Sequence, residues 1–221
     1  MTLDGPAGSG KSTTAKEVAR RLGLRHLDSG ALYRALTFAL LDRGVPDAEW
    51  PGLGVEAFAS LGVELRPSDG GFEVHAGGRL LVDELRSAEV TDRVPILARL
   101  PAARACLLDL QRSAGAHGRL VADGRDMGTV VFPDADLKVF LVADVEERAR
   151  RRLKQDGDET PSAQLLQEQV EAISERDHID SARDISPLRK PAGAVEIDTT
   201  KLSFEEQVSA IVALARRLTL P

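Results

Sequence analysis

Residues 4–13 read DGPAGSGKST, and this stretch decides the fold. Positions 5–12 fit the pattern GxxxxGK[ST] of a phosphate-binding loop. Glycines let consecutive backbone N–H groups turn toward phosphate oxygens, and the helix that follows directs the positive end of its dipole at the same point. The pattern therefore predicts binding of a nucleoside triphosphate by Gly5, Pro6, Ala7, Gly8, Ser9, Gly10, Lys11, Ser12 and Thr13.

Two side chains of this loop carry the predicted chemistry. Lys11 would reach the β- and γ-phosphates, and the Ser12 hydroxyl would bind Mg²⁺ that arrives with the nucleotide. Asp123 ends a predicted strand, where a second acidic group near Mg²⁺ is expected, although an aspartate there could also cap a turn. The chain contains no asparagine and so has no Asn-Lys-x-Asp guanine-reading motif, which argues against a switch-type GTPase.

Composition narrows the class of protein further. The 221 residues are 43% hydrophobic, enough for one α/β domain, and the net charge of −6 argues against general nucleic-acid binding. The single cysteine excludes an internal disulfide and fits a reducing compartment. With no secretion leader and no long apolar run, we expect a cytoplasmic protein without a membrane partner. The four histidines form no zinc-binding motif.

Strand and helix patterns alternate along most of the chain. The helices are predicted over 11–23, 31–44, 94–118, 145–155, 162–184 and 203–220, and the strands over 1–3, 119–126, 135–144 and 194–200, with a strand end and turn over 24–30. This alternation predicts an α/β fold of the P-loop three-layer type with a mainly parallel central sheet. Residues 63–85 show short alternating pieces around glycine pairs, which predicts a small antiparallel insert.

Arginines mark a second anion site. On the helix over 162–184, an apolar stripe that includes Ile173 continues at helical spacing into Asp177 and Asp180, flanked by Arg176 and Arg183. An inward face that becomes charged is better explained by an anion-binding cleft than by a solvated surface. Asp180 lies at i±3 or i±4 from both arginines and can aim them.

Two further groups of arginines are less decisive. Arg148, Arg151 and Arg152 share a helix face beside the loop DGDETP, and this face is either a solvated surface laced by a Glu147–Arg151 pair or a mobile lid. Arg34 and Arg125 each follow a predicted strand, where α/β sheets bind ligands.

Several motifs together carry a family likeness. DGPAGSGKST, LDSGALYR, VADGRDMGTVVFPDADLKVFLVAD, ERARRR, RDHIDSARDISPLRK and IDTT occur in this order and resemble bacterial cytidylate kinases nearly end to end. The resemblance implies a nucleoside monophosphate kinase, usually monomeric, that transfers the γ-phosphoryl of ATP with Mg²⁺ to CMP or dCMP. It implies a single kinase domain whose core is formed by 1–30, 110–148 and 163–221, with an acceptor-binding region at 31–109, an insert at about 63–85 and a lid at 149–162.

The resemblance also assigns roles to residues. Ser29 and Arg34 lie at acceptor-binding positions, and Arg104 and Asp126 at positions that read the cytosine. Arg176, Asp180 and Arg183 would hold the phosphate and ribose of the acceptor, and Arg125 and Arg151 would contact phosphate during transfer. The predicted catalytic set is Lys11, Arg125, Arg151 and Arg176.

Two points qualify this assignment. Pro95 stands where the family pattern has a serine near the cytosine, so one base contact is replaced or lost. Phosphoryl transfer demands no general base, and Asp123 and Asp126 are the nearest candidates for one.

Other functions stay open on the sequence. The runner-up is another small-acceptor kinase of this fold, acting on UMP, AMP or a shikimate-like metabolite. A non-catalytic ATP-binding regulator is the alternative from a different class, but a regulator needs no second anion site.

Overall fold

Parallel strands and the helices that follow them form the first of two units, Met1–Leu22 with Val121–Pro221. The structure is a computed structural model that describes residues 1–219. Within this unit β1 (Thr2–Asp4) lies between β6 (Leu120–Gly124) and β7 (Lys138–Val142), and β8 (Val195–Asp198) follows β7. All three pairings are parallel. The carboxyl ends of the strands therefore share one edge, where ligands of α/β sheets bind.

The register of the strands places polar side chains at that edge. Leu3 lies opposite both Asp123 and Val139, so Asp4 and the residues after it begin at the carboxyl edge of the sheet. The three residues of β1 are fully buried. The strand is short, yet it is central, because it has a hydrogen-bonded neighbour on each side.

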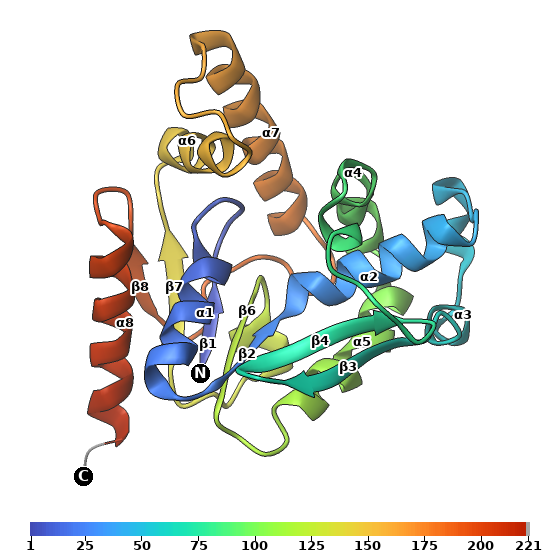
Figure 1. Ribbon diagram of the computed structural model, residues 1–221, viewed down its shortest axis with the longest axis horizontal. Coiled ribbons are helices and arrows are strands. Elements are labelled where there is room, and N and C mark those ends of the chain that lie inside the picture. The colour runs from blue at the N-terminus through green and yellow to red at the C-terminus, as the bar shows by residue number, and fades with distance from the viewer. Residues whose placement is uncertain (220–221) are drawn as a thin grey trace. The chain divides into compact units, whose positions relative to one another are not determined.

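Helices α1, α6, α7 and α8 complete the described part of the first unit (Figure 1). α1 (Lys11–Leu22) packs against α8 (Phe204–Thr219), where the Gln207 amide donates to the Thr14 hydroxyl. The capping box of Ser203 and Glu206 starts α8, because each donates its backbone N–H to the other's side chain. α6 (Val145–Gln155) and α7 (Ala163–Ser181) pack together beyond the carboxyl ends of the strands. A single π-helical turn, η3 (Met127–Val131), follows β6.

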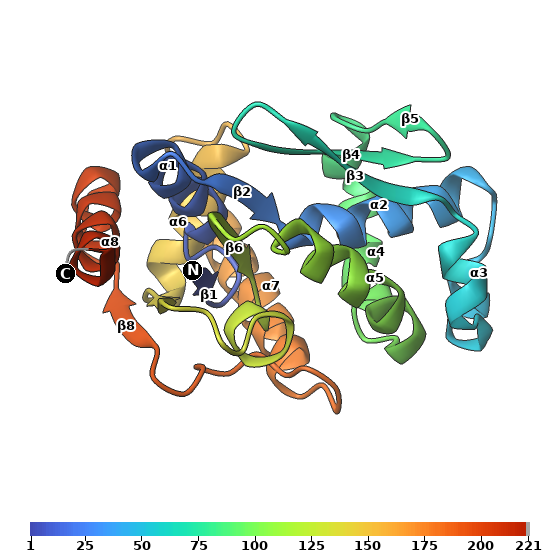
Figure 2. The same ribbon diagram turned by 90° about the horizontal axis from the view of Figure 1, so that it is seen from below.

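The second unit spans Gly23–Leu120 and combines helices with a small sheet. Its antiparallel strands are β3 (Val63–Ser68), β4 (Gly71–Ala76) and β5 (Arg79–Leu80), in that order (Figure 2). The remaining elements are β2 (Arg25–Asp28), α2 (Ser29–Asp42), η1 (Asp47–Gly52), α3 (Val55–Ala59), η2 (Glu84–Arg86), α4 (Ala88–Leu97) and α5 (Pro101–Ala114).

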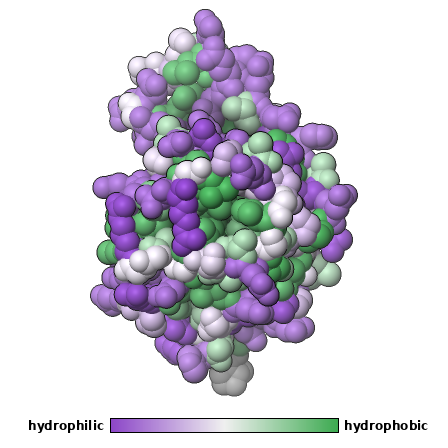
Figure 3. Space-filling view, turned by 90° about the vertical axis from the view of Figure 1, so that its right-hand side faces the viewer, coloured by the Kyte–Doolittle hydropathy of each residue, from purple (hydrophilic) through white to green (hydrophobic). Residues whose placement is uncertain are grey.

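The second unit has its own apolar core. Trp50, Phe58, Leu36, Leu97 and Leu107 are fully buried. The surface that faces the viewer in Figure 3 is mostly hydrophilic, with hydrophobic residues gathered near its middle.

The predicted fold class is confirmed, including the parallel sheet and the antiparallel insert. The single helix predicted over 94–118 is wrong. The end of α4 and the whole of α5 occupy this stretch, and residues 98–100 separate the two helices. Proline lacks the N–H that a helix interior needs and fits the first helical turn, so Pro101 starts a new helix. Among residues 1–219, no helix has the length and hydropathy required to span a membrane.

Candidate active site

The phosphate loop connects β1 to α1, as the sequence pattern requires. Gly8 and Gly10 have φ values of 73° and 79°, which side chains disfavour. A Cβ on Gly5 would lie 2.3 Å from the Leu141 carbonyl oxygen, so the loop needs glycine there for close approach to β7. The glycines therefore allow the loop between β1 and α1 to pack closely against β7.

Lys11 is a buried cation at the first turn of α1. It is 7% exposed, and its Nζ donates to the Pro6 carbonyl oxygen at 3.1 Å. Burial lowers the pKa of Lys11 to about 7, and Arg125 lowers it further while Asp123 and Asp180 oppose the change. At neutral pH, a negative charge bound beside this amine would therefore favour its ammonium form.

Ser12 and Asp123 form the group that fits a metal ion. The Ser12 hydroxyl donates to Asp123 Oδ2, and Asp123 is buried at the end of β6. A hydroxyl and a carboxylate beside a phosphate loop are the hard oxygen donors that Mg²⁺ prefers. The donor chemistry therefore fits the metal predicted from the sequence.

Asp180 gathers arginines from two segments of the first unit. It accepts from Arg125 Nε at 2.7 Å, and its Oδ1 lies 3.7 Å from Arg183 Nη1. Burial alone would raise the pKa of Asp180, but Arg125, Arg183 and Arg176 outweigh it, so the pKa lies below its usual value. Arg183 is buried, and its Nε donates to the Asp180 carbonyl oxygen at 3.1 Å. Two guanidinium groups pair with this carboxylate and that of Arg176 lies near enough to lower its pKa, so three positive charges surround one negative charge.

This arginine cluster and the phosphate loop influence each other electrically. After burial, the largest influence on the pKa of Lys11 is the lowering by Arg125, and Arg176 also lowers it. Both arginines therefore lie close enough to Lys11 to repel its charge. A polyanion bound here would be attracted from two directions at once.

Arg148 and Asp177 attach the loop to α6 and α7. Arg148 Nη1 donates to the Ala7 carbonyl oxygen at 2.8 Å and also to Asp177, and the Ala7 N–H donates to Asp177 Oδ1 at 2.9 Å. A Cβ on Gly8 would lie 3.1 Å from the Arg148 Cβ and carbonyl oxygen. The start of the loop is thus pinned by side chains from two helices.

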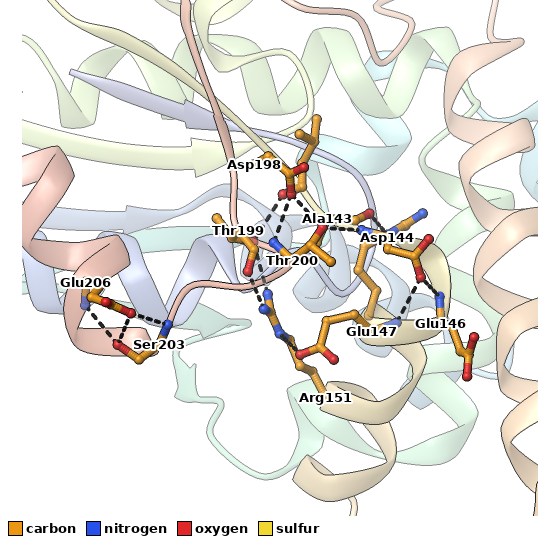
Figure 4. Close-up of polar contacts among 12 residues, drawn as sticks. Ala143, Asp144, Glu146, Glu147, Arg151, Asp198, Thr199, Thr200, Ser203 and Glu206 are labelled. Atoms are coloured by element: carbon orange, nitrogen blue, oxygen red, sulfur yellow. Dashed lines mark hydrogen bonds and ion pairs between the residues drawn. The ribbon is translucent and has the colours of Figure 1, made fainter.

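Arg151 points elsewhere (Figure 4). Its Nη2 donates to the Thr199 carbonyl oxygen at 2.6 Å and its Nε to Glu147 at 2.8 Å. The Glu147–Arg151 pair, on which the solvated-surface interpretation depends, is therefore present. Neighbouring turns are ordered in the same area, because Asp144 caps the N-terminus of α6 and Asp198 accepts from Thr200. A phosphate contact of Arg151 stays a prediction.

Three predicted acceptor-binding residues lie in the second unit. Ser29 is buried at the start of α2, where Asp28 caps the helix by accepting from the Ala31 N–H. Arg34 Nη1 donates to Thr91 Oγ1 at 3.0 Å. Arg104 is buried on α5, where its guanidinium carbon lies 5.4 Å from the centroid of a tyrosine ring. These contacts hold the Arg34 and Arg104 side chains within their own unit.

Sequence reasoning did not select three polar residues of the first unit. Arg148 was recognised in a cluster but not placed at the phosphate loop, and Asp177 was assigned only to a helix face. Asp4 was overlooked, although it is fully buried and its two carboxylate oxygens accept from the Met127 and Gly128 N–H groups, both at 2.8 Å. The signal for Asp4 was a charge at the end of a buried central strand.

The fold and the site define a P-loop kinase: a phosphate loop after the central strand, a hydroxyl and a carboxylate suited to Mg²⁺, and a second cationic cluster beside them. Residues 1–217 match the sequence model of the family described as cytidylate kinase. The chain belongs to the cytidylate kinase family.

Individual relatives agree with this membership. A cytidylate kinase of Exiguobacterium sp. is 44% identical over 217 residues, covering 97% of this chain and 95% of the relative. One of Anoxybacillus flavithermus is 42% identical over 219 residues, covering 98% of this chain and 95% of the relative. A bifunctional pantoate ligase/cytidylate kinase of Synechocystis sp. is 44% identical over 219 residues, and the match covers 98% of this chain but 42% of that longer relative.

Proposed function

We propose that this protein transfers the γ-phosphoryl group of ATP to CMP or dCMP, giving CDP or dCDP. The observation that carries the proposal is the arginine cluster around Asp180, close enough to lower the pKa of Lys11. A kinase with a phosphorylated acceptor needs two sets of positive charge, one for the donor and one for the acceptor. A protein that only senses ATP needs one.

On the donor side, the loop over residues 5–13 surrounds the ATP phosphates, and its backbone N–H groups bind them, except at Pro6, which has no N–H, and at Ala7, whose N–H donates to Asp177. Lys11 binds the β- and γ-phosphates. Ser12 and Asp123 would hold Mg²⁺, which supplies neutralisation of charge on the phosphate oxygens. Binding these anions restores the ammonium form of Lys11, since they offset the burial that lowers its pKa.

On the acceptor side, Arg176 and Arg183 grip the phosphate of CMP, and Asp180 holds them in place. Arginine suits this task because its planar fork binds phosphate oxygens in pairs. Asp126 and Arg104 read the base: an aspartate accepts from the exocyclic amino group of cytosine, and an arginine donates to the ring acceptor beside it. The family resemblance, with Ser29 and Arg34 as further acceptor contacts, supports these assignments.

Transfer itself then requires alignment rather than covalent help. Lys11, Arg125 and Arg151 stabilise the negative charge on the phosphoryl group during its transfer, and no general base is needed. The segment 149–162, which contains the end of α6 and the loop after it, acts as a lid that excludes water, the competing acceptor. We assign the acceptor-binding region to 31–109, and we place the protein, as a monomer, in the reducing cytoplasm.

A coupled assay of ADP formation tests the proposal with ATP, Mg²⁺ and a panel of acceptors. CMP and dCMP should give the highest kcat/KM, and CDP should be recovered as product. If the protein prefers UMP, AMP or shikimate, the proposed acceptor is wrong, but the protein is still a kinase. Tight ATP binding with no phosphorylated product from any acceptor would overturn the proposal in favour of a regulator.

A further inference from the structure

Asp4 is a buried carboxylate that the proposed reaction does not use. It is fully buried at the last position of β1, and the next residue, Gly5, begins the phosphate loop. Burial raises the pKa of Asp4 to about 6, although the Gly128 and Met127 N–H groups favour its charged form. A buried carboxyl group is costly unless its partners compensate, so its contacts indicate what it does.

Those contacts reach one segment. Oδ1 accepts from the Met127 N–H and Oδ2 from the Gly128 N–H, both at 2.8 Å. These are the first two residues of η3, and the residue before them is Asp126. Asp4 thus holds the backbone directly after the aspartate assigned to the base. β1 and β6 are adjacent strands, so the contact spans one strand spacing at the carboxyl edge (Figure 1).

The segment is shaped to accept this contact. A Cβ on Gly128 would lie 2.8 Å from the Thr2 hydroxyl and 3.2 Å from Asp4 Oδ2. Glycine there lets the backbone approach the carboxylate, and any side chain would push the turn away. Asp126 is itself 4% exposed, with φ −141° and ψ 20°, which is neither helix nor strand. Its backbone conformation is therefore held by its surroundings rather than by a regular element.

We infer that Asp4 is a positioning residue for base recognition: its carboxylate fixes the Met127 and Gly128 N–H groups and thereby aims the Asp126 side chain at the acceptor base. The backbone of Asp4 leads directly into Gly5, the first residue of the phosphate loop. Asp4 therefore connects the loop that binds the donor to the turn that presents Asp126 to the acceptor. This inference rests on the proposed function, since it assumes that Asp126 contacts cytosine.

The test is Asp4→Asn, which keeps the shape of the side chain but can accept only one of the two N–H groups. KM for CMP should rise about tenfold, and the preference for CMP over UMP in kcat/KM should fall by a similar factor. KM for ATP should stay within about twofold of wild type. The matched control is Thr2→Ser on the same strand, which deletes a buried methyl group but keeps the hydroxyl beside Gly128, and it should leave all these values unchanged.

A merely structural role would reduce the active fraction and lower kcat for every acceptor alike, without a shift in KM or in base preference. That result, or an equal rise in KM for CMP and ATP, overturns the inference about Asp4. The proposed function is not affected by it, provided that the wild-type protein forms CDP. If wild type makes no CDP, the proposed function itself has failed.

A second variant and a measurement on wild type guard against misfolding of Asp4→Asn. Gly128→Ala keeps the carboxylate and displaces the turn, and it should raise KM for CMP selectively. In the unmodified protein, amide hydrogen exchange of Met127 and Gly128 should be slow and should slow further with CMP but not with ATP. Fast exchange at both amides overturns the inference without any substitution.

Discussion

Replacing Lys11 with methionine should stabilise the unliganded protein while it removes catalysis. Lys11 is 7% exposed, and its pKa is lowered from 10.5 to about 7, chiefly by burial. In the unfolded chain the Lys11 ammonium is in contact with water. Folding at neutral pH removes that water, and the cost of burying the charge lowers the free energy of unfolding. Methionine fills similar space without a charge, and the burial cost disappears.

The magnitude and its sign follow from linkage. Because the folded-state pKa is the lower one, the unfolded chain binds more protons between about pH 7 and 10.5, and stability rises with pH through that window. The cost of Lys11 is about 4 kcal/mol at pH 7 and falls to about 2 kcal/mol at pH 9. Below pH 7 the cost levels off, because both states then carry the proton.

Urea unfolding without nucleotide measures this difference. The stabilisation by Lys11→Met should be about 2 kcal/mol larger at pH 7 than at pH 9. The packing difference between lysine and methionine cancels in this comparison, since it does not depend on pH. Lys16→Met, on the exposed face of α1, is the control and should show no such change. An equal effect of Lys11→Met at both pH values would refute the burial argument.

Three further outcomes are expected. Arg183→Ala should lower kcat/KM for CMP by roughly 2–4 kcal/mol through loss of a charge-assisted phosphate contact, and near-normal steady-state kinetics would remove Arg183 from the site. Asp126→Ala should raise KM for CMP much more than KM for ATP, and equal increases would mean that Asp126 does not read the base. The pKa of Asp4 is raised to about 6, so its contribution favours folding below about pH 4 and is lost as pH rises through 6. Wild type should therefore lose about 2 kcal/mol relative to Asp4→Asn between pH 4 and pH 7, and parallel stability curves from chemical unfolding at each pH would contradict this.

The fold was predictable because its determinants are local. The glycine pattern of residues 5–12 has one structural context, a strand that leads into a helix, and the alternation of patterns predicts parallel pairing. Helix geometry also predicted which face of α7 turns inward, and Asp180 is buried there. The break between α4 and α5 was missed because Pro101 was included in a continuous helical pattern.

The contacts of individual side chains were less predictable. Arg148 and Arg151 lie on the same helix three residues apart, yet one binds the Ala7 carbonyl oxygen and the other binds Thr199. Sequence spacing gives only the face of the helix. The partner depends on how α6 meets the loop and β8, which is set by packing over long sequence separations. Asp4 was hidden for the same reason, since its partners lie more than a hundred residues away.

Both polar groups of the Ala7 backbone are used within the protein itself. The N–H donates to Asp177 and the carbonyl oxygen accepts from Arg148, so two successive peptide planes of the phosphate loop are immobilised by α6 and α7. A loop held in this way has little conformational freedom left to lose when a nucleotide binds, which favours affinity. The same attachment makes the two helices a lever on the loop. Any movement of α6 and α7 relative to β1 must therefore either carry Ala7 with it or break these two hydrogen bonds.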